Sequence, residues 1–333
     1  MKCSNFILLF LSIFLVACGG NSDTSNNPSP NTPTTGSSTG TLSIALSDAP
    51  MRGVTGVMLQ LDELVMTDES NVQHHYSLQG QHVDLIDYQG SHSLKVVDGL
   101  TMPIGNYHNV YMSVIQGDGN NGCYVEDDQG IHAMQVQDGR IPLMDFAVVA
   151  NQHHSFTAEI GLYMGLHQDQ EHNYTLSHHG SWSVNNRYMG HLLGEVDPQW
   201  IAECETQHSA MLPINSEYMH LAYLYPNTVT SLTQMGDVND AMSAGHISAI
   251  AVAPLRQDSA GNWYFEMGYL PEGTYRVDYS CLGDLDDPHR DDINSGLFSM
   301  FADAGTVTID AGADGGSHTV MQCGRGNGGH HGG

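Results

Sequence analysis

The stretch GTLSIALSDAP, from Gly40 to Pro50, decides the fold class because its side chains alternate between apolar and polar. Neighbouring side chains on a β-strand point to opposite faces, so Leu42, Ile44 and Leu46 share one face of an extended segment. A helix would instead need apolar residues every three or four positions. The pattern therefore predicts a strand with one apolar face at the start of the folded part.

The same alternation recurs farther along the chain. It is present in Val57, Leu59 and Leu61, and again in residues 156–162. Clusters of Gly, Asn and Asp separate such runs, as in QGDGNNG at 116–122, whereas residues 286–304 fit a short helix or an irregular loop equally well. Short strands divided by turns are typical of sandwiches, so we expect an all-β fold.

Two segments far apart in the sequence are alike. MPIGNYHNVYMSV at 102–114 and LPEGTYRVDYSC at 270–281 both place a Pro-x-Gly-x-Tyr turn before an alternating run. Proline and glycine favour the turn, and the tyrosine opens the strand that follows. The likeness predicts two β-sandwich domains in tandem.

The N-terminus has the features of an exported lipoprotein. Lys2 precedes an apolar run at 6–16 and the small-residue region Ala17-Cys18-Gly19, which is the order found in signal peptides. The run is shorter than the roughly 20 residues that a membrane-spanning helix needs. Leu15-Val16-Ala17-Cys18 resembles a bacterial lipobox, which implies cleavage after residue 17 and lipidation of Cys18. Several acyl chains make a stable anchor, since each buried CH₂ contributes about 0.8 kcal/mol.

The residues after Cys18 predict where the anchored protein resides. In Gram-negative lipoproteins of this kind, an aspartate directly after the lipidated cysteine favours the inner membrane, and this chain has Gly19 there. We therefore expect the outer membrane and leave open whether the protein faces the periplasm or the outside. Residues 19–40 contain only Gly, Asn, Ser, Asp, Thr and Pro, so we expect a flexible linker that lifts the folded part off the lipid.

The composition is strongly acidic, with 37 Asp and Glu against nine Lys and Arg and a net charge of −28. Such a surface repels a phosphate backbone, which argues against nucleic acid as a partner and against charge-driven binding to anionic lipid. The expected contact with the bilayer is acylated Cys18. An envelope protein or a glycan is the other class of partner that the sequence leaves open.

Four of the six cysteines belong to the folded part. Cys3 is lost with the signal peptide and Cys18 is lipidated, which leaves Cys123, Cys204, Cys281 and Cys323. An even number in an exported chain favours disulfides, and four cysteines allow three pairings. The spacing does not choose among them.

Four segments together resemble a bacterial lipoprotein family known as domain of unknown function 4382. They are GTLSIALSDAP at 40–50, HVDLIDY at 82–88, MPIGNYHNVYMSV at 102–114 and VNNRYMGHLLGEVD at 184–197. The resemblance covers roughly residues 40–197 and implies a secreted β-rich domain with no assigned reaction. The segment at 263–288, WYFEMGYLPEGTYRVDYSCLGDLDDP, is similar to transthyretin-like and carboxypeptidase-regulatory-like sandwiches.

These resemblances define the expected domains. A signal peptide occupies 1–17, the lipidated cysteine and linker 18–40, a first β-sandwich 41–197, a transthyretin-like β-sandwich 198–323, and a flexible Gly/His tail 324–333. Similar C-terminal domains have one cysteine shortly after the junction and one at the end of the strand after the Pro-x-Gly-x-Tyr turn. The resemblance thus implies a Cys204–Cys281 bond, and Cys123 with Cys323 follows by elimination.

Aspartates gather in DLDDPHRDDIN at 284–294, and carboxylate oxygens are the ligands that calcium prefers. The five are Asp284, Asp286, Asp287, Asp291 and Asp292. A second segment, GDVNDAMSAG at 236–245, begins like a calcium loop but places Ala241 and Met242 where a ligand and the turn glycine belong. The loop at 284–294 is therefore the predicted ion site, for Ca²⁺ rather than Zn²⁺.

The histidines and the enzyme motifs give weaker indications of function than the acidic loop does. The chain has 20 histidines, but its pairs at 74–75, 153–154 and 178–179 are adjacent, which on a strand points them to opposite faces. No His-x-His, His-Glu-x-x-His or phosphate-binding glycine loop occurs. We therefore predict an outer-membrane lipoprotein with a binding or structural role and no enzymatic activity. The alternatives are an envelope protein that binds Ca²⁺ or a transition metal, and a carbohydrate-active enzyme.

Overall fold

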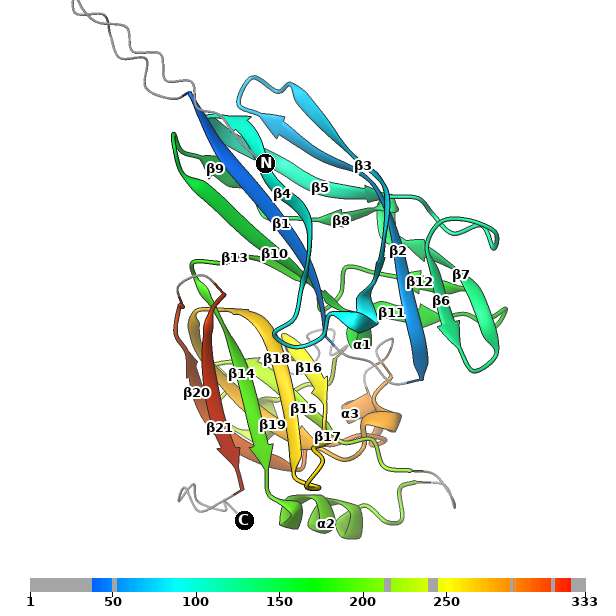
Figure 1. Ribbon diagram of the computed structural model, residues 1–333. Coiled ribbons are helices and arrows are strands. Elements are labelled where there is room, and N and C mark those ends of the chain that lie inside the picture. The colour runs from blue at the N-terminus through cyan, green and yellow to red at the C-terminus, as the bar shows by residue number, and fades with distance from the viewer. Residues whose placement is uncertain are drawn as a thin grey trace, which may run out of the picture. The chain divides into compact units, whose positions relative to one another are not determined.

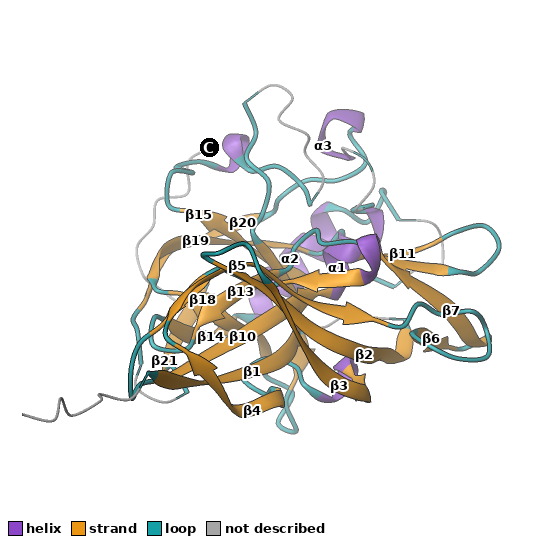
Figure 2. Ribbon diagram, turned by 90° about the horizontal axis from the view of Figure 1, so that it is seen from above, coloured by secondary structure: helices purple, strands orange, loops and turns teal. Residues whose placement is uncertain are grey.

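The computed structural model describes residues 38–49, 53–212, 217–238, 245–287, 290, 292–312 and 315–324 (Figure 1). Strands dominate these residues, as Figure 2 shows, and the predicted all-β class is confirmed. The predicted signal peptide, Cys18, Asp291 and nearly all of the linker and tail lie outside the described residues. No helix in the described ranges has the length and hydropathy needed to cross a membrane.

The first sandwich consists of two sheets. The smaller sheet has the strand order β13-β10-β1-β4, formed by β1 (Thr39–Ala49), β4 (Leu94–Pro103), β10 (His153–Gly161) and β13 (Trp182–Asn185). The larger has the order β11-β12-β7-β6-β2-β5-β8, with β3 beside β2 and β9 beside β5. Its strands are β2 (Val54–Asp68), β3 (Gln73–Asp84), β5 (Gly105–Val114), β6 (Tyr124–Asp127), β7 (Gly130–Val136), β8 (Arg140–Pro142), β9 (Phe146–Val148), β11 (Leu166–Gln168) and β12 (Tyr174–Leu176).

The second sandwich also has two sheets. One has the order β17-β18-β14-β21, and the other β16-β15-β19-β20. Their bounds are β14 (Met189–Val196), β15 (Leu221–Pro226), β16 (Ala251–Pro254), β17 (Arg256–Gln257), β18 (Trp263–Pro271), β19 (Gly273–Ser280), β20 (Ala302–Ile309) and β21 (Ser317–Cys323). Helix α2 (Pro198–Gln207) follows β14; short helical turns are η1 (Leu85–Asp87), η2 (Gln137–Gly139), α1 (Leu162–Gly165), η3 (Leu232–Gln234), η4 (Gly283–Leu285) and α3 (Asp292–Ser295).

Strand β14 differs from the domain boundary that the sequence predicts. We expected the first sandwich to extend to Asp197, but β14 pairs antiparallel with β18 and parallel with β21, the last strand. A turn at 185–188 separates it from β13, with the Tyr188 amide donating to the Asn185 carbonyl at 2.8 Å. The hydrogen bonding therefore divides the two sandwiches between β13 and β14, within one compact unit that spans Ser37–Gly333.

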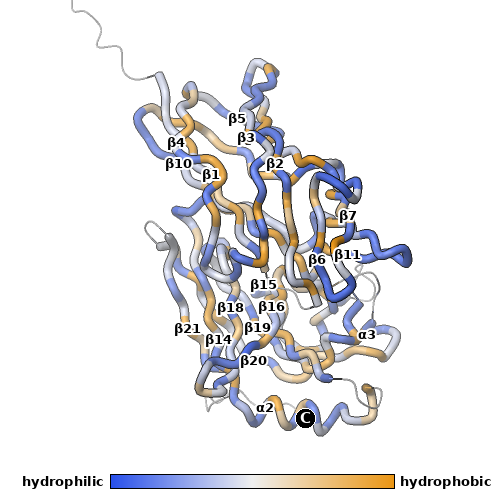
Figure 3. Tube along the Cα trace, turned by 45° about the vertical axis from the view of Figure 1, so that its right-hand side comes forward, coloured by the Kyte–Doolittle hydropathy of each residue, from blue (hydrophilic) through white to orange (hydrophobic). Residues whose placement is uncertain are grey.

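Each sandwich encloses its own core, and one short helix contributes to both. Figure 3 shows hydrophobic residues along the strands and hydrophilic ones in connections such as that between β6 and β7. In α1, Leu162 packs in the first core, whereas Tyr163 and Met164 pack in the second. The two cores are therefore joined through α1.

Further contacts join the sandwiches around β18. The Tyr269 hydroxyl donates to the Ser93 hydroxyl at 2.8 Å, and the Trp182 indole nitrogen donates to the Tyr269 carbonyl at 2.8 Å. Next to Tyr269, the main chain of Gly268 lies so close to Gly90 that a Cβ on Gly268 would be 1.8 Å from the Gly90 carbonyl oxygen. The two sandwiches thus meet backbone to backbone at this point.

Strand β1 is buried on both faces, which the alternating pattern does not predict. Its apolar face packs in the first core, and Ser47 and Asp48 on β1 are fully buried as well. The Ser47 hydroxyl and the Asp48 amide both donate to the Tyr88 carbonyl, at 3.2 and 2.8 Å. Asp48 is also close enough to buried Glu159, on β10, for the two carboxyl groups to interact electrostatically.

This buried acidic pair predicts a pH dependence of stability. Burial raises the pKa of Glu159, and burial together with Glu159 raises the pKa of Asp48, although Gln89 and Arg256 lower it. A carboxyl group whose pKa is higher in the native state than in the unfolded state stabilises the native state at low pH. This stabilisation is fully present below the unfolded pKa of about 4 and is lost as the pH rises through the native pKa. We expect the free energy of unfolding of Glu159→Gln at pH 8 to exceed that of wild type by about 2 kcal/mol. Its melting temperature should be higher accordingly.

The measurement is thermal unfolding of wild type and Glu159→Gln from pH 5 to pH 8. The advantage of the variant should shrink toward pH 5, because more of the wild-type carboxyl groups are protonated at lower pH. Glu171→Gln, at an exposed turn position, is the matched control and should show no such trend. A pH-independent difference between wild type and Glu159→Gln would contradict the assignment.

Candidate metal centre

Three buried aspartates meet in the second sandwich, two from one loop and one from a distant part of the chain. Asp237 follows η3, Asp286 follows η4, and Asp292 begins α3. One carboxylate oxygen from each lies within 4.8 Å of the others, and the residues are 0%, 3% and 0% exposed. Within the described ranges, this is the group of His, Cys, Asp or Glu that has the geometry to hold a metal ion.

Local hydrogen bonds explain how the chain brings Asp292 to Asp237. The backbone amide of Asp292 donates to Asp237 Oδ2, and the next amide, of Ile293, reaches the same oxygen at 3.4 Å. Asp292 Oδ2 accepts from the amide of Asp287 at 2.6 Å, and its Oδ1 accepts from Arg290 Nε at 2.6 Å. Asp237 thus holds the start of α3, and Asp292 holds the turn before it.

Two tyrosines from different elements contact Asp286, one at its side chain and one at its carbonyl oxygen. Its Oδ2 accepts from the hydroxyl of Tyr223, on β15, at 2.7 Å. Tyr163, from α1, donates to the Gly283 carbonyl at 3.0 Å and lies 3.4 Å from the Asp286 carbonyl. Burial raises the pKa of Asp286 to about 7; Tyr223 lowers it and the charge of Asp237 raises it.

The structure unites only part of the predicted calcium loop. Asp286 and Asp292 meet, whereas Asp284 lies exposed in η4 and Asp287 contributes its backbone amide to Asp292. Asp291 is outside the described residues. The predicted set therefore needs correction for Asp284 and Asp287, whose carboxylates do not belong to the cluster of Asp286 and Asp292.

Asp237, the third member of the cluster, is absent from the predicted loop. It belongs to GDVNDAMSAG, the segment that begins like a calcium loop in the sequence. The sequence signal for Asp237 was its place at the start of a segment that begins like a calcium loop. The positions that follow do not have the ligand spacing of such a loop. Asp237 completes the cluster from a distant part of the chain, which a one-loop pattern cannot represent.

The structure contains a Cys204–Cys281 disulfide, the pairing that the family resemblance implied. It joins α2 to the residue after β19. The second implied pairing, Cys123 with Cys323, is wrong, because both thiols are free. Cys123 packs in the first core and Cys323 in the second, so the two sulfurs do not meet. Burial raises the pKa of Cys123 to about 11 and that of Cys323 to about 12.

The adjacent histidine pairs have separate partners. His74 lies 2.8 Å from Asp68 Oδ2, whereas His75 lies 2.8 Å from Glu63 Oε2. His178 Nε2 is 2.9 Å from the Arg140 carbonyl oxygen. His74 and His75, on β3, thus have different carboxylate partners, in agreement with the opposite faces expected on a strand, whereas His178 lies in a turn.

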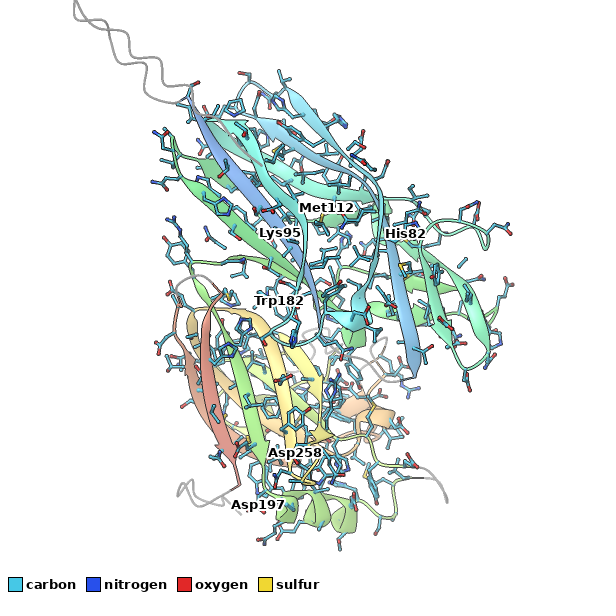
Figure 4. The ribbon with its side chains drawn as sticks, viewed as in Figure 1. His82, Lys95, Met112, Trp182, Asp197 and Asp258 are labelled. Carbon is cyan, nitrogen blue, oxygen red and sulfur yellow. A yellow bond between two sulfur atoms is a disulfide. The ribbon has the colours of Figure 1, made fainter. Side chains whose placement is uncertain are left out.

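A groove of about 530 Å³ lies where β14 ends and β18 begins. Asp197 and Asp258, both labelled in Figure 4, contribute to its lining. The lining also includes Glu195, Trp263, Tyr264 and Glu266. Three of the four carboxylates accept hydrogen bonds from the protein itself: Asp197 from the Gln199 amide, Asp258 from the Asn262 amide, and Glu195 from the Gln322 side chain.

Comparison with known families supports part of the sequence interpretation. Residues 39–177 match the family described as "Domain of unknown function (DUF4382)". This match confirms the resemblance for most of the first sandwich and ends before β13, short of the predicted boundary at Asp197. The comparison with curated proteins found no significant match.

Solved structures with some likeness to this chain have low sequence identity and low TM-scores. The Bacillus anthracis TIE protein is 11% identical, with a TM-score of 0.18; the match covers 85% of this chain but 34% of that protein, about a third of its length. The fimbrial anchor protein Mfa2 from Porphyromonas gingivalis is 9% identical, with a TM-score of 0.17 and coverages of 72% and 78%. A major pilin protein from Streptococcus pyogenes is 8% identical, with a TM-score of 0.17 and coverages of 86% and 97%.

Proposed function

We propose that this chain is a lipoprotein anchored in the outer membrane through acylated Cys18, with a binding or structural role at the cell envelope and no catalytic one. The observation that carries the proposal is the motif Leu15-Val16-Ala17-Cys18 followed by a purely polar tract up to Gly40. Strand β1 begins at Thr39, directly where that tract ends. The order of anchor, linker and folded unit is that of a tethered envelope protein.

The second sandwich supports the non-catalytic part of this proposal. A glycosidase-like mechanism needs one carboxyl group kept as an acid and another free as a base or nucleophile. Three carboxylates of the groove described above instead hold its own backbone and side chains. The exposed parts of Trp263 and Tyr264 leave the groove suited to contact with a glycan or with an envelope protein.

Replacing Cys18 with serine tests the anchor. The variant should lose all incorporation of labelled palmitate and should be recovered as soluble protein or as uncleaved precursor, because serine offers no thiol for the acyl chain. The measurement is metabolic labelling combined with flotation of membranes on a density gradient.

Cys3→Ser is the matched control, because it removes a cysteine from the same N-terminal segment and should leave labelling and flotation unchanged. Continued flotation of Cys18→Ser with the outer membrane would contradict the proposal. Protease treatment of intact cells, followed by detection of the folded part, then decides whether the protein faces the outside or the periplasm.

A further inference from the structure

We propose that Asp237, Asp286 and Asp292 bind one calcium ion, and that this ion fixes the turn of the second sandwich which Tyr163 of α1 contacts. The site joins the loop that holds Asp286 and Asp292 to Asp237, which is distant in the sequence. It is independent of the lipid anchor, so either proposal can fail without the other.

The geometry supplies the first argument. Three carboxyl groups, all at most 3% exposed, present oxygens within 4.8 Å of one another. Like charges held that close in a buried place repel each other strongly unless protons or a cation intervene. Since the surrounding backbone amides hold Asp237 and Asp292 in place, the carboxylates cannot simply turn to solvent.

A second, independent observation is an oxygen without a partner. Asp286 Oδ1 is buried and accepts no hydrogen bond, although Oδ2 of the same carboxylate accepts one from Tyr223. A buried carboxylate oxygen left unpaired is costly, and native structures rarely tolerate it without an ion or water. Coordination to a cation shared with Asp237 and Asp292 would satisfy this oxygen.

Charge and ligand chemistry identify the ion. Arg290 Nε lies 2.6 Å from Asp292 Oδ1 and brings one positive charge to the three carboxylates. Three negative charges and one positive charge are balanced by a divalent cation. All the donors are oxygens, which suits Ca²⁺ and its six to eight ligands at about 2.3–2.6 Å better than Zn²⁺, which prefers nitrogen and sulfur.

The site would also affect the contact between the sandwiches. Tyr163 belongs to α1, in the part that matches the family, and donates to the Gly283 carbonyl three residues before Asp286. Its ring packs in the core of the second sandwich. An ion that orders the turn at 283–286 therefore also holds the acceptor of Tyr163, and through it α1.

The experiment uses the mature chain, purified with a chelator and then dialysed. Terbium, which replaces calcium at oxygen sites, should show luminescence sensitised by the neighbouring Tyr223, and added calcium should abolish it. Calcium at about 100 times its dissociation constant should raise the melting temperature by roughly 5 °C, by mass action on the folded state. Zinc should give neither effect.

Asp286→Asn should lose both the terbium signal and the calcium-dependent shift, whereas Asp62→Asn, at an exposed position on β2, should keep both. If Asp286→Asn does not fold, equilibrium dialysis of wild type with ⁴⁵Ca²⁺ still decides, with one bound ion per chain expected. No bound calcium, or a shift with zinc in place of calcium, would overturn the proposal. Calcium should also slow amide exchange in α1 of wild type but not of Tyr163→Phe, and equal slowing in both would refute the coupling to α1.

Discussion

Replacing both Cys204 and Cys281 with alanine should lower the free energy of unfolding by on the order of 4 kcal/mol. The bond closes a loop of 77 residues, and its loss increases the conformational freedom of the unfolded chain. It also joins α2 to the end of β19, and both sulfurs are fully buried. The measurement is equilibrium denaturation in urea, with the double variant and wild type compared at the same pH.

A reductant provides the matched test of the same bond. Dithiothreitol should lower the stability of wild type toward that of the double variant, and it should leave the variant unchanged because its remaining thiols are already free. If the reductant leaves the stability of wild type unchanged, the loss in the double variant comes from packing of the sulfur atoms and not from the cross-link.

Gly268→Ala should cost about 3 kcal/mol, at the upper end of the range for overpacked sites. A Cβ at this position would lie 1.8 Å from the carbonyl oxygen of Gly90 and 2.7 Å from its carbonyl carbon. Both atoms belong to the backbone, so no change of rotamer can make room. The two sandwiches must then separate locally, which also strains the Tyr269 hydrogen bond to Ser93.

Gly273→Ala is a suitable control, because it is a glycine of the neighbouring strand β19 where a Cβ would come no closer than 3.4 Å to any atom. Thermal unfolding should show a large decrease for Gly268→Ala and little change for Gly273→Ala. A Gly268→Ala protein as stable as wild type would mean that the sandwiches do not meet at Gly90.

The strands could be predicted because a strand is a local pattern. Alternation at Leu42, Ile44 and Leu46 identified β1, and their complete burial follows. The sequence did not reveal that Ser47 on the other face is buried too, since that depends on the main chain at Tyr88, to which its hydroxyl donates. Helix α2 had a readable signal, with Asp197 as N-cap and Pro198 in its first turn, but one ten-residue helix is easily missed in a chain dominated by turns.

Only part of the candidate metal centre could be predicted, because only part of it is local in the sequence. Asp286 and Asp292 belong to one acidic loop and were found together, although Asp284 of that loop lies apart. Asp237 joins them only because its carboxylate accepts the Asp292 amide across the fold. The family resemblance gave the Cys204–Cys281 pairing, but elimination failed for Cys123 and Cys323, because an even number of thiols does not oblige them all to pair.

The parallel pairing of β14 with β21 has a consequence for how this protein reaches its native state. The side chains of Glu195 and Gln322, on these neighbouring strands, are 127 positions apart in the chain. The sheet that contains β14 therefore cannot be completed until β21 has been synthesised. Contacts so distant in sequence form slowly and leave strand edges exposed meanwhile. During that interval the edge of β14 that later pairs with β21 stays open to pairing with other chains, so shortened chains that lack β21 should aggregate more readily than the complete one.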